Sequence, residues 1–588
     1  MRPVVRSACR MLATALLAAV SSLSAQNAKG IIPVNDVLAA RVDDYLSRLE
    51  SMGYTGGVLV LRDGETVVER SYGFANRAAG VRADTATVYN LGSITKQFTA
   101  AAILRLEELG TLRTTDSIGR FFADAPADKR GITLHQLLTH TAGFDSDYSP
   151  TDYEPTTREE YVGRMMRAPL RSAPGTKFFY ANAGYSLLAA IVEKVTGEDY
   201  EVALRELVLR PAGMLETGYK APHWDARRVA HGYQNGRDWG TIVDRIAPDG
   251  APWWELRGNG GLHTTLGDIA RWDAALRDNR VLTDSSRRKY MAPYVNEGPE
   301  GRSQYAYGWS VMKTPRGTRL VTHNGGNGVY VAELLRFVDE GITIFLTSTS
   351  SEAPASPVVR QLERIAFGAS YELPPKRATV ATASLSAVAG SYRLADGSRL
   401  ILRARGDQLL AEAVGQMAFQ LVSAGDTASA PRAAELNSRA AMIVNALVNG
   451  NVVPLRAALD ESPDSASLSR DEAEMMAGRR ERFGEFQSVE VLGTVRGEGG
   501  DLETTVRLNF ANGGATNIYA WSLDERIVDV RAKPWQPVEF IPVSDSEFRT
   551  FNLRSGTGLR LRGEKTPLAT AVVVDLPDGS MRLTPVKP

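Results

Sequence analysis

Alternating apolar positions in the first 370 residues predict two β-hairpins. Val58–Leu61 and Thr66–Val68 flank the pair Asp63-Gly64, which favours a two-residue turn. Val329–Phe337 and Gly341–Leu346 form a second pair of apolar runs. Apolar runs of helical character lie between the two hairpins. Early and late strands that join into one antiparallel sheet, with helices inserted between them, predict an α+β fold.

One helical run carries a candidate nucleophile and its base. Ile94–Leu109 has few helix breakers, and Gly110 follows it as a stop signal. Ser93 and Lys96 are three residues apart at its start, so they share one face of the helix. A serine hydroxyl with a lysine as proton acceptor is a known arrangement for acyl transfer.

The S-x-x-K spacing alone is a weak signal. It recurs at Ser286–Lys289, in a charged stretch, and at Ser310–Lys313, in a strand-like segment, and chance explains both copies. Ser93 could also be a helix cap, with Lys96 as a solvated first-turn residue. The Ser93 copy differs because of the motifs that follow it.

Two further polar motifs follow in order. Tyr180-Ala181-Asn182 precedes a helical run that ends at about Gly197, and Asn182 offers both a donor and an acceptor. His323-Asn324-Gly325-Gly326 lies between two strand-like segments, where glycine lets the backbone approach a ligand. The alternatives are core packing for Tyr180 and a loop position for His323.

The ordered set S-x-x-K, Y-x-N and H-x-G resembles the serine β-lactamase and penicillin-binding-protein family, in its branch of class C β-lactamases, D-amino-acid peptidases and esterases. Flanking segments at Thr133–Gly143, Gly258–Leu262 and Thr265–Ala270 also look like the family. The similarity covers a hydrolase domain of about residues 36–370. It implies a β-lactamase/transpeptidase-like antiparallel sheet flanked by helices.

The resemblance also implies catalytic roles. Ser93 would attack a carbonyl and become acylated, while Lys96 and Tyr180 would share the proton transfers, each poised by the other's charge. Lys96 must be deprotonated to act as a base, so its pKa must be lowered by burial and by nearby positive groups. The N–H groups of Ser93 and Gly326 would form the oxyanion hole.

Asn182, His323 and Gly325 would bind the substrate. His323 stands where many family members carry lysine. With a reference pKa of about 6.5 it is mostly neutral at pH 7. This weakens the case for substrates with a carboxylate, such as penicillins, and favours esters, amides or amine-terminated D-peptides. If a charged His323 binds carboxylates, the kcat/KM of carboxylate-bearing substrates should rise relative to that of neutral esters as the pH falls toward about 6.5.

Two functions remain open at this point. The first is a serine hydrolase that works through an acyl-enzyme on an ester, amide or lactam. The second is a non-catalytic or slowly acylating module that binds penicillin or peptides. The chain has no G-x-S-x-G elbow, which argues against an α/β-hydrolase. His135 and His140 lack the H-E-x-x-H pattern, so we expect them to hydrogen-bond within the fold rather than bind zinc. No metal and no cofactor is predicted.

The polar, turn-rich stretch Phe144–Glu160 is expected to form a loop at the rim of the site and to shape substrate choice. The alternative is a surface excursion without a role in catalysis.

Composition and the N-terminus bear on location. The net charge of zero gives no electrostatic case for binding nucleic acid. Arginines at positions 2, 6 and 10 precede the apolar run Met11–Val20, which predicts a signal peptide over 1–25, cut near Ala25. We therefore expect a periplasmic or secreted protein without a membrane span in the mature chain. Cys9, the only cysteine, would be removed with the signal peptide.

Several domains are expected in a chain of 588 residues. After a boundary near Glu372–Lys376, short strands predict a small β-domain over 384–425 plus 536–588, with Phe419–Val422 as one strand. Residues 433–535 read as helices followed by a curved sheet. They loosely resemble a nuclear-transport-factor-like cone inserted into the β-domain. These β-rich and α+β accessory domains could bind a cell-wall fragment or a protein partner, or act as a spacer.

Overall fold

The computed structural model describes residues 34–586 except 149–150, 235–236, 247–252, 299–300, 351–354, 425–429, 460–474, 498–500, 523, 534–536, 553–557, 566–569 and 577–578. The expected signal peptide, 1–25, lies outside the described residues. The described chain forms two compact units, and the division between them falls between Ser370 and Tyr371 in the sequence. No helix in these described ranges is long and apolar enough to cross a membrane.

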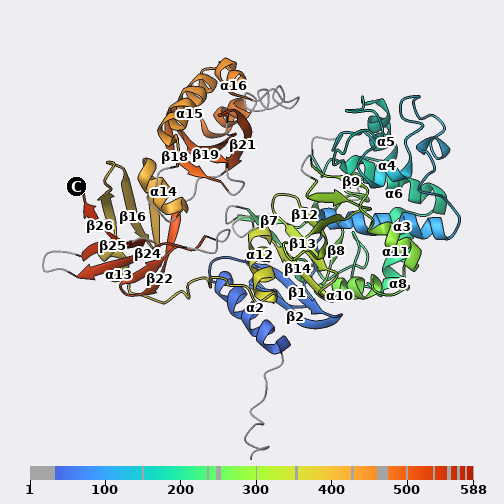
Figure 1. Cartoon of the computed structure of the whole chain (residues 1–588), viewed down its shortest axis with the longest axis horizontal. Helices are drawn as coiled ribbons and strands as arrows, with labels where there is room; N and C mark the ends of the chain where they lie inside the picture. Colours follow the sequence, from blue (N-terminus) through green and yellow to red (C-terminus); the bar gives the residue numbers. More distant parts are fainter. Residues whose placement is uncertain are drawn as a thin grey trace, which may run out of the picture. The chain divides into compact units, whose positions relative to one another are not determined.

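An antiparallel sheet forms the centre of the first unit (Figure 1). Within the described residues it has eight strands, in the order β2-β1-β14-β13-β12-β11-β10-β9. Their bounds are β1 (Gly56–Arg62), β2 (Glu65–Tyr72), β9 (Val295–Asn296), β10 (Ser303–Tyr305), β11 (Ser310–Lys313), β12 (Arg319–Gly326), β13 (Val331–Phe337) and β14 (Ile342–Ser348). The early and late hairpins pair through β1 and β14, with Leu59 opposite Phe345. The predicted α+β fold is confirmed.

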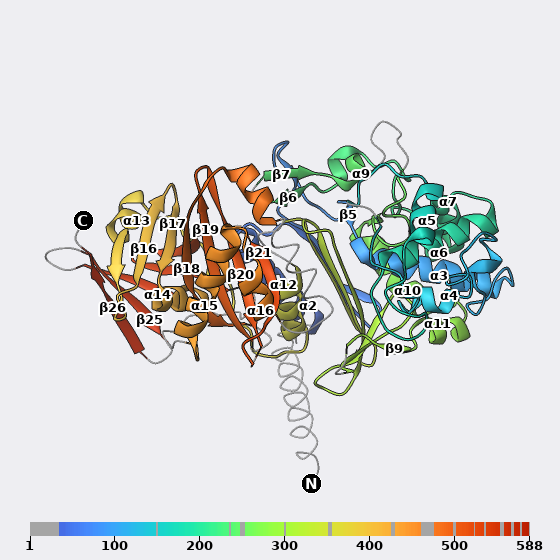
Figure 2. The ribbon, with the colours of Figure 1, turned by 90° about the horizontal axis from the view of Figure 1, so that it is seen from above.

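Helices lie on both faces of this sheet (Figure 2). On one face, α2 (Val34–Glu50) contacts β2, and α12 (Ala355–Ala366) contacts β13 and β14. On the other face, α10 (Leu266–Ala275) contacts β1 and β14. Beyond α10 lies a helical cluster that consists of α3 (Thr95–Glu108), α4 (Leu134–Leu138), α5 (Arg158–Arg167), α6 (Asn182–Thr196), α7 (Tyr200–Leu204), α8 (Arg210–Ala212) and α11 (Asp284–Tyr290). Burial on two sides explains why β1 is apolar almost throughout.

Shorter elements connect these layers. They are β3 (Phe74–Asn76), β4 (Val81–Arg82), β5 (Tyr89–Asn90), β6 (Gly232–Gln234), β7 (Arg237–Gly240), β8 (His263–Thr264) and α9 (Ile242–Arg245).

Helix α3 runs through the core of the first unit. Its side chains are buried from Thr95 to Leu104. The run Ala100-Ala101-Ala102 has small side chains, so α6 can pack closely against it. The first turn is buried as well, and Lys96 has 0% of its surface exposed.

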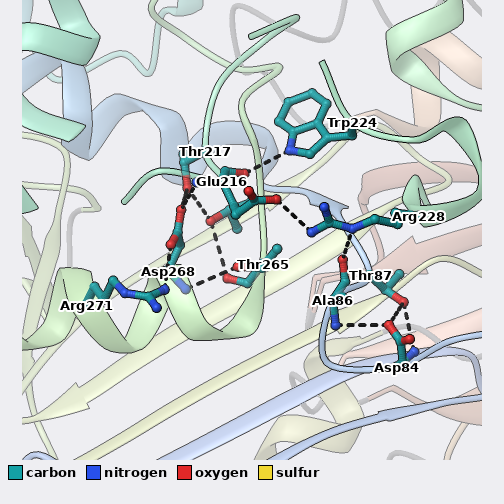
Figure 3. Close-up of polar contacts among 11 residues, drawn as sticks. Asp84, Ala86, Thr87, Glu216, Thr217, Trp224, Arg228, Thr265, Asp268 and Arg271 are labelled. Atoms are coloured by element: carbon teal, nitrogen blue, oxygen red, sulfur yellow. Dashed lines mark hydrogen bonds and ion pairs between the residues drawn. The ribbon is translucent and has the colours of Figure 1, made fainter. Parts of the chain in front are cut away.

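A buried carboxylate anchors helix α10 (Figure 3). Asp268 accepts hydrogen bonds from the Thr217 hydroxyl at 2.7 Å and from the Glu216 N–H at 2.8 Å, and it pairs with Arg271 at 2.8 Å. Thr265 caps the same helix by accepting from the Asp268 N–H. The flanking segment Thr265–Ala270 therefore joins α10 to the chain near Thr217.

The second unit contains a closed antiparallel barrel. Eight of the described strands form it, in the order β15-β16-β17-β22-β23-β24-β25-β26, and β15 pairs with β26 to close it. Their bounds are β15 (Gly390–Arg393), β16 (Arg399–Arg405), β17 (Gln408–Val414), β22 (Val538–Ser544), β23 (Glu547–Arg549), β24 (Arg560–Lys565), β25 (Thr570–Leu576) and β26 (Gly579–Pro585). A short helix, α13 (Thr382–Val388), precedes β15. The barrel strands lie within the segments expected for the split β-domain.

A second sheet lies between β17 and β22 in the chain. It contains β18 (Phe486–Arg496), β19 (Leu502–Phe510), β20 (Gly513–Trp521) and β21 (Ile527–Lys533), and the helices α15 (Ala433–Val448) and α16 (Val453–Ala458) precede it. Helix α15 contacts β18 and β19.

The prediction of a strand at Phe419–Val422 is wrong. These residues belong to a helix, α14 (Gln416–Ala424), which packs on both β17 and β18. A short apolar run has no periodicity that distinguishes a strand from a buried helix. The Gln416 side chain also bonds to the backbone N–H and C=O of Thr494, which fixes the helix to β18.

Candidate active site

Ser93 lies on a tight turn that leads into helix α3. Residues Gly92–Ile94 form a 3₁₀ turn, and the α-helix begins at Thr95, one residue later than the predicted start. Ser93 is partly exposed, whereas Lys96 is fully buried one turn further on. The predicted nucleophile therefore reaches solvent and the predicted base does not.

Three oxygen atoms surround the Lys96 amine in the described part of the chain. Nζ lies 3.1 Å from Ser93 Oγ, 2.8 Å from Asn182 Oδ1 and 2.8 Å from the carbonyl oxygen of Asn259. The structure thus brings together residues from three of the segments that carry the family resemblance.

Lys96 has an unusually low pKa. Burial lowers this pKa to about 7, whereas the carboxylates of Asp147 and Asp152 act in the opposite direction and raise it. The expectation of nearby positive groups is therefore wrong, because the charged neighbours that act on Lys96 are negative. A substantial fraction of the amine is still unprotonated at neutral pH, as a base requires.

Tyr180 lies beside the lysine as a neutral phenol. Lys96 Nζ is 4.8 Å from the centre of the Tyr180 ring. Burial raises the pKa of Tyr180 well above its ordinary value, and the Ser93 side chain opposes this shift. The expectation that Lys96 and Tyr180 poise each other by charge is wrong, because burial is the main cause of both shifts.

Asn182 begins helix α6, and both ends of its amide are engaged. Oδ1 accepts from Lys96, and Nδ2 donates to Asp147 Oδ1 at 3.0 Å. A primary amide has two N–H groups, so one remains for a substrate carbonyl.

Strand β12 lies directly against the Ser93 turn at two glycines. A Cβ on Gly92 would lie 2.5 Å from Gly326 N, and one on Gly325 would lie 2.7 Å from Ser93 N. Gly92 also has φ +50°, which favours glycine. This close approach places the N–H groups of Ser93 and Gly326, the predicted oxyanion-hole donors, on adjacent backbone segments.

His323 is buried on the same strand, with 4% of its surface exposed. Nδ1 pairs with the carbonyl oxygen of Asn324, so it carries the proton, and Nε2 accepts from the Tyr305 hydroxyl at 3.0 Å. Burial lowers the pKa of His323 to about 4, and Lys96 contributes to the shift. The expectation that His323 titrates near its reference value is wrong, and it is neutral throughout the physiological range.

The rim loop reaches the site at more than one point. Besides the bond from Asp147 to Asn182, the Tyr153 hydroxyl accepts from Asn327 Nδ2 at 2.9 Å, next to Gly326. Tyr153 also contacts Trp239, with ring centres 5.7 Å apart. These contacts connect the stretch Phe144–Glu160 with both α6 and the end of β12.

Three residues near the base were not predicted from the sequence: Asp147, Asp152 and Asn259. Asn259 acts through its backbone carbonyl, which no side-chain pattern reveals, although Gly258–Leu262 was recognised as a flanking segment. The two aspartates lie in a loop without a motif of its own.

The remaining candidates have structural partners. Lys289 pairs with Glu107 at 2.7 Å, and the Ser310 hydroxyl donates to Glu297 at 2.8 Å. His135 bonds to the Tyr307 hydroxyl at 2.7 Å, and His140 Nδ1 accepts from the Ala181 N–H at 3.1 Å. Over the described ranges, no three His, Cys, Asp or Glu side chains are grouped to hold a metal ion.

Fold and site together define a serine hydrolase of the β-lactamase-related type. The chain belongs to the beta-lactamase family, whose model matches residues 42–369. Penicillin-binding protein 4* of Bacillus subtilis is 27% identical over 402 residues, which are 64% of this chain and 88% of that protein. Esterase EstB of Burkholderia gladioli is 29% identical over 374 residues, 55% of this chain and 93% of that protein.

A solved structure shares the fold over both units. The octameric penicillin-binding protein homologue from Pyrococcus abyssi has a TM-score of 0.52 and 18% sequence identity. The match covers 93% of this chain and 99% of that chain.

Proposed function

We propose that this protein hydrolyses an ester or amide through an acyl-enzyme formed on Ser93, with Lys96 as the base. One observation carries the proposal: a buried amine with a pKa of about 7 lies 3.1 Å from a partly exposed serine hydroxyl. This distance is within hydrogen-bond reach, as a nucleophile and its base require.

In the first step, Lys96 takes the hydroxyl proton while Ser93 Oγ attacks the carbonyl carbon. The N–H groups of Ser93 and Gly326 stabilise the oxyanion, and loss of one such donor typically costs about 3–4 kcal/mol. When the tetrahedral intermediate collapses, the leaving group needs a proton. Tyr180 supplies it as a neutral phenol and regains a proton from Lys96. Water then repeats the sequence on the acyl-enzyme and releases the acid.

The substrate class follows from His323. A neutral imidazole gives no positive charge for a substrate carboxylate, so we propose esters, amides or amine-terminated D-peptides as substrates. Support comes from a relative that is named an esterase. A module that acylates without turnover would instead give a burst of product and no steady rate.

Export completes the proposal. Its support is the N-terminal sequence, in which an arginine-rich segment precedes an apolar run. The mature protein would then work in the periplasm or outside the cell. A cell-wall fragment or a protein partner for the second unit remains a prediction.

The test is hydrolysis of p-nitrophenyl acetate by the wild type, by Ser93→Ala and by Ser286→Ala. Ser286 is the matched control because it begins another S-x-x-K sequence away from the site. We expect Ser93→Ala to abolish the rate and Ser286→Ala to preserve it. A rate that survives in Ser93→Ala would refute the proposal.

A further inference from the structure

The unprotonated lysine has one lone pair, and three neighbours compete for its orientation. A neutral amine offers two N–H donors and one acceptor position. The carbonyl oxygen of Asn259 can only accept, so it takes one N–H. The lone pair then faces Ser93 only if Asn182 takes the other N–H through its Oδ1 atom.

An asparagine amide can present either an oxygen or an NH₂ group to its neighbour. If the Asn182 amide turned over, its NH₂ group would donate to the Lys96 lone pair and compete with the Ser93 hydroxyl. The direction of this amide therefore decides whether the base is aimed at the nucleophile. An outside partner must fix that direction.

Asp147 is that partner. Its carboxylate accepts from Asn182 Nδ2 at 3.0 Å, and an ionised carboxylate can only accept. Its second oxygen accepts from the Ser146 hydroxyl at 2.7 Å. The Ser146 carbonyl in turn accepts from the Ala183 N–H at 2.9 Å, so the loop is fixed to the start of α6 beside Asn182.

We propose that Asp147 is a positioning residue, which holds the Asn182 amide so that the lone pair of Lys96 points at Ser93. The rim loop then belongs to the catalytic apparatus. This inference rests on the proposed roles of Ser93 and Lys96.

The charged and titratable groups around Lys96 set its pKa, whereas the Asn182 amide sets the direction of its lone pair. Asp147 and Asp152 on the rim loop raise its pKa. The rings of Tyr180 and Tyr185 lie 4.8 and 5.8 Å from Nζ. Two further titratable neighbours in the described part of the chain, His140 and His323, are kept neutral because burial lowers their pKa.

Asp152 supplies a charge-matched control. It acts on Lys96 through its charge, and within the described ranges its side chain makes no hydrogen bond. Asp152→Asn therefore removes a neighbouring charge without touching Asn182. Asp147→Asn removes a charge and keeps an oxygen that can accept from Asn182, whereas Asp147→Ala removes both.

The experiment measures the pH profile of kcat and of kcat/KM for p-nitrophenyl acetate with these three variants. Each loses one negative charge near Lys96, so each acid limb should move to lower pH. Only Asp147→Ala should also lower kcat on the alkaline plateau, by roughly 10- to 100-fold, with little change in KM. Equal plateaus for Asp147→Ala and Asp152→Asn would overturn the proposal.

A second variant separates orientation from any effect on folding. In Asn182→Asp both side-chain oxygens accept equally, so there is no amide to orient. Adding Asp147→Ala to Asn182→Asp should therefore cost no further plateau rate, and a repeated 10- to 100-fold loss would contradict the proposal. Melting temperatures of all variants are compared to detect any effect on folding. Asp147 lies exposed on a loop, so its substitution should leave the melting temperature nearly unchanged. Failure of the proposed function is distinct, because Ser93→Ala would then retain activity.

Discussion

Lys96 Nζ lies 3.1 Å from Ser93 Oγ, yet only the serine is accessible to solvent. The first turn of α3 is buried, and in the preceding 3₁₀ turn only Ser93 is partly exposed, because Gly92 and Ile94 are buried. Burial without a positive neighbour is sufficient to bring the lysine pKa to about 7. The burial that hides the amine from solvent therefore also leaves a substantial fraction of it unprotonated at neutral pH.

Lys96→Arg should lower kcat/KM by about 10²- to 10⁴-fold, because a guanidinium stays protonated and cannot accept the Ser93 proton. Lys313→Arg is the matched control, since Lys313 is the exposed lysine of another S-x-x-K sequence. The kcat/KM for ester hydrolysis is measured for both variants and for the wild type. Comparable rates for wild type and Lys96→Arg would rule out lysine as the base.

The pH dependence should show a single acid limb near neutrality. A base must be unprotonated, so kcat/KM for a neutral ester should rise as the pH passes through about 7 and then level off. The profile of p-nitrophenyl acetate hydrolysis from pH 5 to 9 measures this. A rate that is flat across this range would exclude Lys96 as the titrating group.

Tyr180→Phe should affect amides more than activated esters. The phenol donates a proton to the leaving group, and p-nitrophenolate leaves without one. We expect roughly a 10²-fold or larger loss on an amide and a much smaller loss on the p-nitrophenyl ester. Parallel assays of both substrates provide the comparison, and equal losses would remove Tyr180 from leaving-group protonation.

Selectivity between neutral and carboxylate-bearing esters should not change between pH 5.5 and 8. Burial keeps the pKa of His323 at about 4, so the imidazole gains no charge in this range. The ratio of kcat/KM for a matched pair of esters tests this. A ratio that moves toward the carboxylate substrate as the pH falls through about 6.5 would show that His323 titrates like an exposed histidine.

Gly325→Ala should impair both activity and stability. The added Cβ would lie 2.7 Å from Ser93 N and closer still to the Leu91 carbonyl oxygen, so β12 or the Ser93 turn must move. Overpacking of this kind typically costs about 1–3 kcal/mol. Gly131→Ala, in an exposed turn with open space and without a left-handed backbone, is a control for adding a methyl group. Melting temperature and kcat are the readouts, and unchanged values would contradict the close approach.

Much of the first unit could be predicted from local patterns. The hairpin at Asp63-Gly64 and the helix that stops at Gly110 both follow from turn and capping rules. The motifs at Ser93, Tyr180 and His323 indicated the family, which the comparison with the beta-lactamase model confirms.

The electrostatics of the site could not be predicted in the same way. The pKa of Lys96 depends on the burial of α3 and on carboxylates about 50 residues further along the chain, at Asp147 and Asp152. The pKa of His323 depends on packing around β12. Burial and long-range contacts exist only in the folded chain, so a motif specifies residue types but not their charge states.

Mass spectrometry of the acyl-enzyme is the most direct test of the central claim. The wild type is mixed with a slowly hydrolysed ester, quenched with acid and digested, and the modified peptide is sequenced. We predict that the acyl group is attached to Ser93 and is absent from Ser93→Ala. An adduct on another residue, or steady hydrolysis by Ser93→Ala, would contradict the account.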